Sequence, residues 1–371
     1  MKGSVTYMVN RFTKAVYKAM ANERVTSLKD VAGAAGVSVT TVSRLLNGSL
    51  ELPHETKKRI EDAIRDLNYQ PNPHARRLSR GRSDTIGLVV PDIANPFFAT
   101  LVAAVEEEAD RRGLAVSLYA TLNRSGREVA YLQLIERNHV DGLIFVTNHP
   151  DDGQLGALIN RTGKVVVVDE DVPDALAPKL FCDNDRGGYL AGMHLAEMGH
   201  RRVLFIGGPE RMISAQRRFQ GLERAMDELW GADAVLLNYK GEYTVAFGRD
   251  AAKRFIAEGM PASAIFASSD EIAIGLIEVL RSQGISIPQE VSVVGFDDVG
   301  PLHLFAPPLT AIRQPVRQIG QRALSLLLET NWQERTPSTV EELLPVEIVV
   351  RNSVAPPANP KTAMDKKRTR G

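Results

Sequence analysis

The sequence predicts an N-terminal all-α helix-turn-helix domain followed by an α/β domain with a doubly wound architecture. Two observations lead to this prediction. Three short helical patterns separated by tight turns occupy residues 25–70. From Thr85 to about residue 353, short apolar runs alternate with amphipathic segments. That alternation is typical of parallel strands that are covered by helices on both faces.

The composition is that of a globular protein. The 371 residues include 45 Lys and Arg, 45 Asp and Glu, and one cysteine. This length predicts two or three domains, and the composition excludes wholesale disorder, collagen and a disulfide scaffold. Cys182 alone cannot form an internal disulfide or a cysteine metal cluster, which fits a reducing cytoplasm. No apolar run approaches the roughly 18 residues of a membrane span, and no apolar secretory segment begins the chain. We therefore expect a cytoplasmic protein without a membrane partner.

Charge is distributed unevenly along the chain. Residues 1–82 hold 15 Lys and Arg against 7 Asp and Glu, a balance of +8. Residues 83–371 hold 30 against 38, a balance of −8. This asymmetry favours a basic module that binds a polyanion, attached to an acidic body. A basic face that is merely solvated is the alternative.

The N-terminal domain begins with two helices joined by a tight turn. Ser27 can cap the first helix, with Asp30 at capping-box spacing, and Gly36 ends it. Ser38 can cap the second helix, over residues 39–46. The connection of about three residues is typical of a helix-turn-helix. A third helix over about 54–67 completes a small bundle, which could also be a structural or protein-binding module.

The second helix carries a surface suited to DNA. The side chains that its core does not need are Val39, Thr40, Ser43, Arg44 and Asn47. An arginine can bind guanine O6 and N7 together, and Val39 or the Thr40 methyl can contact a thymine methyl. Ser38, Ser43 and Asn47 suit phosphates. We therefore expect a double-stranded DNA partner.

The α/β body can be divided into its elements. Strands are expected at 86–90, 115–119, 142–146, 165–169, 203–206, 264–267 and 291–296. Helices are expected at 97–112, 127–138, 185–198, 215–229, 246–258 and 270–283. Five glycines are expected to end helices, namely Gly113, Gly199, Gly231, Gly259 and Gly284. Polar residues that follow several of the strands predict a binding edge, because ligands bind beyond the carboxyl ends of parallel strands.

Several ordered motifs carry a family resemblance. The head reads SLKDVAGAAGVSVTTVSRLLNG, and the junction reads LNYQPNPHARRLSRG. The body contains IGLVVPDIANPFF, VDGLIF, GHRRVLFIGGP, SSDEIAIG, IPQEVSVVGFDD and LTAIRQP. Over about residues 25–353 the sequence resembles the lactose/galactose repressor family of bacterial transcription regulators.

For DNA, the resemblance implies that Val39, Thr40 and Arg44 read bases. It maps the family's hinge helix onto residues 73–78, with Ala75 and Arg76 at the DNA and Leu78 wedged into the minor groove. A proline-rich segment this short is not expected to stay helical alone, so it could order only on DNA. The alternative for Leu78 is an ordinary linker residue. A single helix-turn-helix reads one half-site, so we expect a homodimer on a near-palindromic operator, with a tetramer as the alternative.

For the body, the resemblance implies two lobes like those of periplasmic binding proteins, with a small-molecule effector in the cleft between them. The N-lobe is expected at about 84–183 and 314–341, and the C-lobe at about 184–313 and 342–353. Candidate effector-binding residues are Asn95, Phe97, Asn148, Asp169, Ser214, Arg218, Tyr243, Ser269 and Asp297. Arg218 and Asp297 match positions that hold sugar hydroxyls, and Tyr243 matches an aromatic cover.

Alternatives remain for individual candidates. Phe97 could be lobe core, and Asp270 is expected to cap a helix rather than to bind a ligand. A sugar acid would need a second cation, which Arg217 could supply. The remaining segments are residues 1–24, a junction at 71–83, and a disordered basic tail at 354–371. Residues 1–24 are expected to be a disordered extension or to precede the true start of translation, which is left open between Met1 and Met20.

Nothing in the sequence favours an enzyme. It contains no P-loop, no HExxH and no GxSxG motif, and its seven histidines show no metal-ligand pairing. Asp297 and Asp298 are adjacent, so their side chains diverge rather than form a hydrolytic pair. We expect no cofactor, no metal and no catalysis, and instead a repressor whose operator affinity is controlled by a sugar or sugar-acid effector. The alternatives are a regulator activated by a co-effector, with or without a phosphocarrier protein, and a sugar-binding transport component.

Overall fold

The computed structural model describes residues 26–46, 50–69, 83–135, 137, 139–147, 153–330, 332 and 341–358. The chain divides into two compact units, residues 1–82 and 83–371, and each is described by itself. Several sequence predictions lie outside the described residues. They concern Asn47, Ala75, Arg76, Leu78 and Asn148, together with residues 1–24, the junction up to residue 82 and the tail from residue 359.

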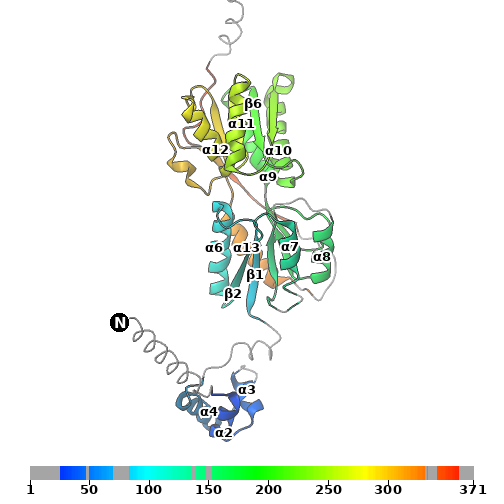
Figure 1. The fold of residues 1–371 in the computed structure, drawn as a ribbon, viewed down its shortest axis with the longest axis vertical. Coiled ribbons are helices and arrows are strands. Elements are labelled where there is room, and N and C mark those ends of the chain that lie inside the picture. Colours follow the sequence, from blue (N-terminus) through cyan, green and yellow to red (C-terminus); the bar gives the residue numbers. More distant parts are fainter. Residues whose placement is uncertain are drawn as a thin grey trace, which may run out of the picture. The chain divides into compact units, whose positions relative to one another are not determined.

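The first unit is a bundle of three helices, α2 (Leu28–Ala35), α3 (Val39–Leu46) and α4 (His54–Asp66) (Figure 1). The predicted capping box is present, because Ser27 N donates to Asp30 Oδ2 at 2.8 Å and Asp30 N donates to Ser27 Oγ at 3.4 Å. Gly36 ends α2 with φ of 66°, a left-handed conformation that favours glycine. Thr41 N donates to Ser38 Oγ at 3.0 Å, which confirms the cap of α3.

The core of this bundle is small and apolar. Its buried members are Val31, Ala32, Ala35, Val42, Ile60 and Ala63. Leu45, Leu46 and Ile64 are partly buried against them. The apolar face of each helix therefore points inward, and the exposed face of α3 is left for other contacts.

The second unit contains two six-stranded sheets. The first sheet has the order β11-β5-β4-β3-β1-β2 and the second has the order β12-β10-β9-β8-β6-β7. The strands of the first sheet are β1 (Thr85–Val90), β2 (Ala115–Ala120), β3 (Leu143–Val146), β4 (Val165–Val168), β5 (Lys179–Cys182) and β11 (Glu341–Leu344). Those of the second are β6 (Arg202–Gly207), β7 (Val235–Lys240), β8 (Ala264–Ala267), β9 (Ser292–Asp297), β10 (Thr310–Arg313) and β12 (Glu347–Val349). All pairings are parallel except β10 with β12.

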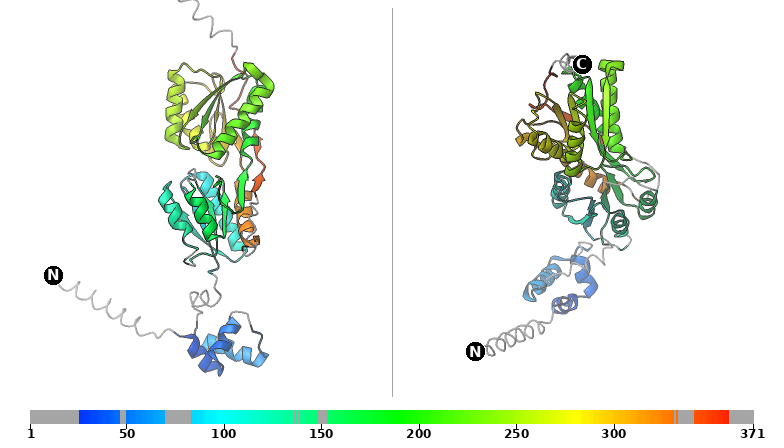
Figure 2. Two further views of the ribbon diagram at one scale, coloured as in Figure 1. Left: turned by 90° about the vertical axis from the view of Figure 1, so that its right-hand side faces the viewer. Right: turned by 45° about the horizontal axis from the view of Figure 1, so that its top comes forward.

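Helices cover both faces of each sheet, as the doubly wound prediction requires (Figures 1 and 2). The first sheet carries α6 (Pro96–Arg111), α7 (Ser125–Leu132), α8 (Gln154–Thr162) and α13 (Val316–Glu329). The second carries α9 (Asn184–Glu197), α10 (Ile213–Trp230), α11 (Val245–Ala257) and α12 (Asp270–Ser282). We call the first sheet with its helices the N-lobe and the second the C-lobe.

Several elements differ from the sequence prediction. The predicted strands are present, but β5, β7, β10, β11 and β12 and the helices α8 and α13 were not predicted. Three of these strands, β7, β11 and β12, are sheet edges that carry polar or charged residues. Because an edge strand is only partly buried, it lacks the continuous apolar run that marks a central strand. Helix α7 ends at Leu132 rather than at residue 138, because the chain turns there and Val140 enters the core.

The boundaries of the second unit also differ. Leu344 still pairs in the N-lobe sheet, so the chain passes to the C-lobe after residue 344 instead of residue 341. The globular unit continues beyond residue 353, because Ala355 N donates to Ser292 Oγ at 3.1 Å and the Ala355 carbonyl lies 2.9 Å from His200 Nε2. The five glycines predicted to end helices all have positive φ. Within the described residues, no helix is long and apolar enough to cross a membrane.

Candidate functional site

A cavity lies where residues from the carboxyl ends of strands in both lobes meet. It encloses about 420 Å³ of space, part of which is open to solvent. Its lining residues are Asn95, Phe97, Phe98, Asp169, Met212, Ser214, Arg218, Tyr243, Ser269, Asp297 and Gln314. Of the nine effector-site candidates, the structure brings all but Asn148 to this cavity, and Asn148 lies outside the described residues.

The N-lobe contributes side chains from the start of α6 and the end of β4. Asn95 caps α6, because its Oδ1 accepts from Phe97 N at 2.8 Å. Phe97 and Phe98 pack edge to face, with ring centroids 5.2 Å apart, and both belong to the hydrophobic core. Phe97 is thus core and cavity wall at once. Asp169 follows β4 with φ of 75°, in the left-handed region that Asp tolerates better than most residues.

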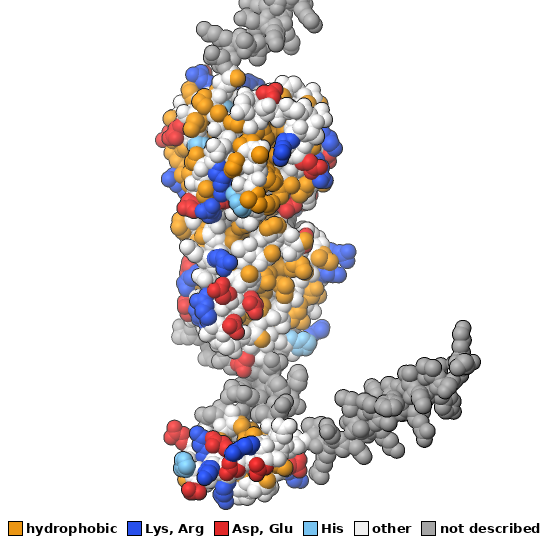
Figure 3. Space-filling view, turned by 90° about the vertical axis from the view of Figure 1, so that its left-hand side faces the viewer, with side chains coloured by type: hydrophobic (Ala, Val, Ile, Leu, Met, Phe, Trp, Pro, Cys, Tyr) orange, Lys and Arg blue, Asp and Glu red, His pale blue; other side chains and the backbone are white. Residues whose placement is uncertain are grey.

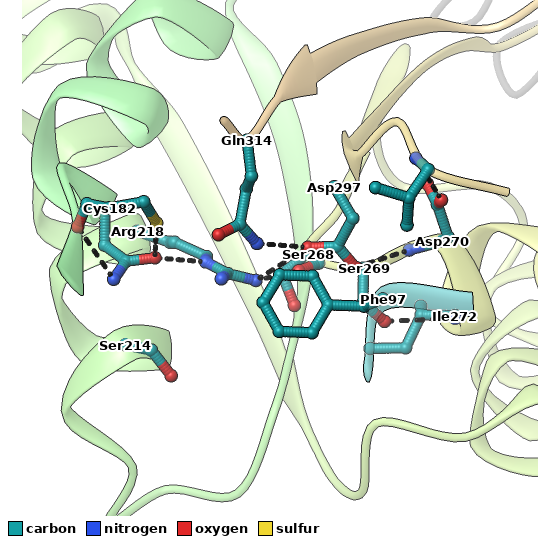
Figure 4. A network of polar contacts seen from close by, with 12 residues as sticks. Phe97, Cys182, Ser214, Arg218, Ser268, Ser269, Asp270, Ile272, Asp297 and Gln314 are labelled. Atoms are coloured by element: carbon teal, nitrogen blue, oxygen red, sulfur yellow. Dashed lines mark hydrogen bonds and ion pairs between the residues drawn. The ribbon is translucent and has the colours of Figure 1, made fainter. Parts of the chain in front are cut away.

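The C-lobe contributes Ser214 and Arg218, one helical turn apart on α10. The Arg218 guanidinium is held by two hydrogen bonds: Nε donates to Asn184 Oδ1 at 2.8 Å, and Nη1 donates to the Ser268 carbonyl at 2.6 Å (Figure 4). The guanidinium carbon also lies 3.7 Å from the Phe296 ring centroid. These contacts fix a buried cation in one orientation.

Asp297 ends β9 opposite Arg218. Its Oδ1 lies 3.9 Å from Arg218 Nη1 and accepts from Gln314 Nε2 at 2.6 Å. Its φ of 89° makes it the second aspartate at this cavity with a left-handed backbone, and it comes from the other lobe than Asp169. Figure 4 shows Gln314 and Arg218 converging on this carboxylate.

Burial raises the proton affinity of the carboxylates here. It raises the pKa of Asp169 to about 7, against the opposing charge of Arg218. It also raises the pKa of Asp297, which Arg218 likewise opposes. Asp169 is deep in the lobe, yet part of its side chain is accessible because it faces the cavity. Among the described residues that line the cavity, Arg218 is the single cation, so two carboxylates share one positive charge.

Tyr243 forms a wall beside Gly208. A Cβ atom at Gly208 would overlap the Tyr243 ring, so this position needs glycine for the ring to lie against the backbone. Burial raises the pKa of Tyr243 to about 12, which keeps its hydroxyl protonated at neutral pH. The cavity therefore offers carboxylate acceptors, a guanidinium, a phenol and aromatic walls, which is a set that binds hydroxyl groups and the apolar face of a small ligand.

Some residues of the site were missed or misassigned. Gln314 and Met212 were not predicted. Gln314 follows β10, a strand that the apolar pattern did not indicate, and the LTAIRQP motif was the one feature of the sequence that pointed to it. Ser269, and not Asp270, caps α12, since Ser269 Oγ accepts from Ile272 N at 3.2 Å. Asp270 instead accepts from the backbone N–H groups of residues 298–300, at 2.7–3.2 Å. Arg217 does not line this cavity and lies 3.6 Å from Glu341.

The DNA-binding candidates that the structure describes lie on α3. Val39, Thr40 and Arg44 are exposed, Ser43 is half-buried, and Ser38 is exposed at the helix start. They therefore form one accessible face of α3, on the side opposite the buried Val42. Cys182 is buried, and burial raises its pKa to about 12, so its thiol is not a reactive thiolate. In the part of the chain that the structure describes, no three His, Cys, Asp or Glu residues form a metal-binding group.

Two protein-family models match the chain. Residues 27–72 match "Bacterial regulatory proteins, lacI family", and residues 193–354 match "Periplasmic binding protein-like domain". Among curated relatives, the transcriptional regulator DegA of Bacillus subtilis is 31% identical over 89% of this chain and 98% of its own length. The repressor PurR of Mannheimia succiniciproducens is 33% identical over 88% and 98%. The repressor CytR of Escherichia coli is 31% identical over 91% and 98%.

Several solved structures have a similar fold. The lac repressor dimer bound to operator and the anti-inducer ONPF has a TM-score of 0.77 and 26% identity, over 90% of this chain and all of that one. The complex of the regulator CelR with cellobiose has a TM-score of 0.66 and 30% identity, over 88% and 99%. A ribose-bound regulator from Enterococcus faecium has a TM-score of 0.64 and 30% identity, over 74% and 100%.

Proposed function

The chain belongs to the lacI family of bacterial regulatory proteins, and on that premise we propose its operator-reading residues and a carbohydrate effector. It is a DNA-binding transcription repressor regulated by a small molecule, and it is not an enzyme. We place its action in the cytoplasm, where operator DNA is accessible.

Operator bases are read by Val39, Thr40 and Arg44 of α3. Their exposure on one helix face supports this assignment, since a recognition helix presents its base-contacting side chains into the major groove. Ser38 and Ser43 are assigned to phosphates. Asn47 is also assigned to phosphate and Ala75, Arg76 and Leu78 to the junction's DNA contacts, and these four assignments rest on the sequence motifs alone.

The effector is a neutral polyhydroxylated ligand of the carbohydrate class. The observation that carries this proposal is the buried pair Arg218 and Asp297 facing a second carboxylate, Asp169, from the other lobe. Two carboxylates accept hydrogen bonds from hydroxyls, while the charge of the single arginine is already offset by these carboxylates and leaves little to neutralise an anion. A sugar acid is disfavoured for that reason, and Arg217 is paired elsewhere. Relatives bound to cellobiose and ribose support the class.

A thermal-shift screen tests the effector class. Neutral sugars would be compared with their own uronic acids and 6-phosphates, because a ligand that binds only the folded state raises the melting temperature. We expect stabilising ligands among the neutral members. A uronic acid that stabilises the protein more than its neutral parent would contradict the proposal. The same sugar, added to a complex with an operator selected from random DNA, shows whether it acts as an inducer or a co-repressor.

We further propose a homodimer. Exposed apolar side chains support it: Ile93, Leu118 and Leu122 are 52%, 41% and 48% exposed, and Leu118 belongs to the edge strand β2. Apolar side chains also gather on the face of both lobes shown in Figure 3. Such surface is uncommon on a monomer. Sedimentation velocity distinguishes monomer, dimer and tetramer, and a monomer at micromolar concentration would contradict the proposal.

A further inference from the structure

Glu170 joins the two lobes beside the effector cavity. It follows β4 in the N-lobe, and its carboxylate reaches the first turn of α10 in the C-lobe. Oε1 accepts from Ile213 N at 2.7 Å, and Oε2 accepts from Ser214 Oγ at 2.7 Å and from Ser214 N at 3.3 Å. The side chain is almost fully buried. Three donors on one helix end therefore hold a single buried carboxylate from the other lobe.

Helix α10 depends on this carboxylate for its cap. Met212 stands at the N-cap position and makes no side-chain capping bond to a described residue. The first turn of a helix has free N–H groups and the positive end of the helix dipole, and both favour a carboxylate there. Hydrogen bonds to an ionised acceptor are also stronger than neutral ones. Glu170 thus supplies from the N-lobe what α10 lacks in its own sequence.

The Glu170 contact and the cavity involve consecutive residues of the chain. Asp169 lines the cavity, whereas its neighbour Glu170 does not. The same α10 turn that receives Glu170 carries Ser214, and the next turn carries Arg218. A ligand that draws Asp169 and Arg218 toward itself therefore acts on both sides of the Glu170 contact. One side is the segment after β4 that carries Glu170, and the other is the start of α10. Effector occupancy can therefore couple to this contact, provided that the ligand favours one arrangement of the lobes over another.

A second link between α10 and the N-lobe is weaker. Arg217 Nη2 lies 3.6 Å from Glu341 Oε1, with side chains that are 32% and 43% exposed. An ion pair at this exposure is screened by water and contributes little. The buried Glu170 contact is the stronger of the two.

We propose that Glu170 is an interlobe latch, a positioning residue that holds α10 against the N-lobe and transmits effector occupancy to the arrangement of the lobes. This inference rests on the proposed function only in that the cavity is taken as the effector site. Loss of the latch widens the range of lobe arrangements and weakens the effect of effector on operator affinity.

The test compares Glu170→Ala and Glu170→Gln with Glu210→Gln, a control that removes an exposed carboxylate bound to Lys240 in the C-lobe. Spin labels at Ala157→Cys on α8 and Asp227→Cys on α10 measure the interlobe distance, with labelled chain diluted into unlabelled chain. Both positions are exposed, and the native Cys182 is buried and does not compete for the label. Glu170→Gln keeps the side-chain volume and guards against a folding defect in Glu170→Ala.

The expected result is a broadened distance distribution in both Glu170 variants and an unchanged one in the control. Operator affinity without effector should stay within about twofold of that of the parent chain. An effector typically changes the affinity for the second ligand by a factor of about 5–150, and we expect this factor to be at least about fivefold smaller in the Glu170 variants. A distribution identical to that of the parent chain would overturn the latch. If no sugar binds the parent while the distribution still broadens, the carbohydrate proposal fails and the latch stands.

Discussion

At the scale of the residue, the proposed effector site is defined by aspartates at strand ends in opposite lobes. Asp169 and Asp297 both adopt positive φ, which costs free energy and persists only where surrounding structure enforces it. Asp297 is buried and Asp169 is half-buried, and both face a single cation among the described residues that line the cavity. A ligand that donates hydrogen bonds to them compensates for their lost hydration.

Replacement of Asp297 should separate DNA binding from regulation. Asp297→Ala removes an acceptor at the cavity and leaves the first unit unchanged, so operator affinity should persist while the response to effector is lost. Fluorescence anisotropy of a labelled operator, with and without the sugar found by thermal shift, measures both. A normal response would remove Asp297 from the site.

Asp169 should make stability depend on pH. Its pKa is raised from 3.8 to about 7 in the folded chain, so the folded state binds more protons and is favoured at low pH. This contribution is lost as pH rises through about 7, and it amounts to at most about 4 kcal/mol. Asp169→Asn should therefore raise the melting temperature at pH 8 but not at pH 4, because Asn stays neutral and tolerates positive φ. Calorimetry of both proteins would contradict this if the variant were less stable at pH 8.

Arg44 should carry operator specificity. Arg44→Ala should weaken binding to the operator by about 1–3 kcal/mol and leave binding to random DNA nearly unchanged. Arg65→Ala, on the exposed face of α4, is a matched control for loss of one positive charge. Equal losses on operator and random DNA, or equal effects of the two substitutions, would show that Arg44 contacts only phosphate.

At the scale of the element, the position of α10 sets where two of the cavity's side chains lie. It packs on α9 so closely that a Cβ at Gly221 would overlap the Asp185 carbonyl, and a Cβ at Gly188 would overlap the Arg218 carbonyl. The two helices cross backbone to backbone. Because both Ser214 and Arg218 belong to α10, this close crossing sets how far they reach into the cavity.

Gly221→Ala should push α10 away from α9. We expect a loss of stability of about 1–3 kcal/mol, as for other overpacked sites, and weaker effector binding because Arg218 moves with the helix. Gly126→Ala on α7 is the control, since a Cβ there meets no atom within 4 Å. Chemical denaturation and isothermal titration measure the two effects. If the variant binds effector normally despite lost stability, the helix crossing does not position Arg218.

At the scale of the whole molecule, the portion that carries the helix-turn-helix and the portion that contains the cavity have net charges of opposite sign. Residues 1–82 carry a balance of +8 and residues 83–371 one of −8. The basic portion is suited to phosphates, and the acidic body is repelled by them. Nucleic-acid binding and effector binding should therefore respond to salt in different ways.

Salt should weaken operator binding far more than effector binding. Phosphate contacts release counterions, so operator affinity should fall at least about tenfold between about 50 and 200 mM salt. Effector affinity should change by less than about twofold, because a neutral ligand in a buried cavity displaces few ions. Anisotropy and calorimetric titrations over that range measure both. A salt-insensitive operator affinity would mean that the basic residues do not neutralise phosphates.

The local elements and most of the residue types at the cavity can be predicted from the sequence. Ser27, Gly36 and Ser38 marked the helix ends of the first unit, and continuous Val and Ile runs marked the central strands. The family resemblance singles out Arg218, Asp297 and Tyr243, and all three line the cavity. These signals are local, since caps depend on neighbouring residues and buried strands on their own apolarity.

Three features became apparent in the three-dimensional structure alone: Gln314 at the cavity, the contact of Glu170 with the start of α10, and the edge strands β7, β11 and β12. Gln314 is 17 residues from Asp297, and Glu170 is 44 from Ser214. Their contacts depend on how the sheets are ordered and how the chain crosses between lobes, and no short-range pattern encodes that pairing. A polar residue in a loop looks the same in sequence whether it faces solvent or caps a helix in the other lobe. Packing alone decides between these two roles.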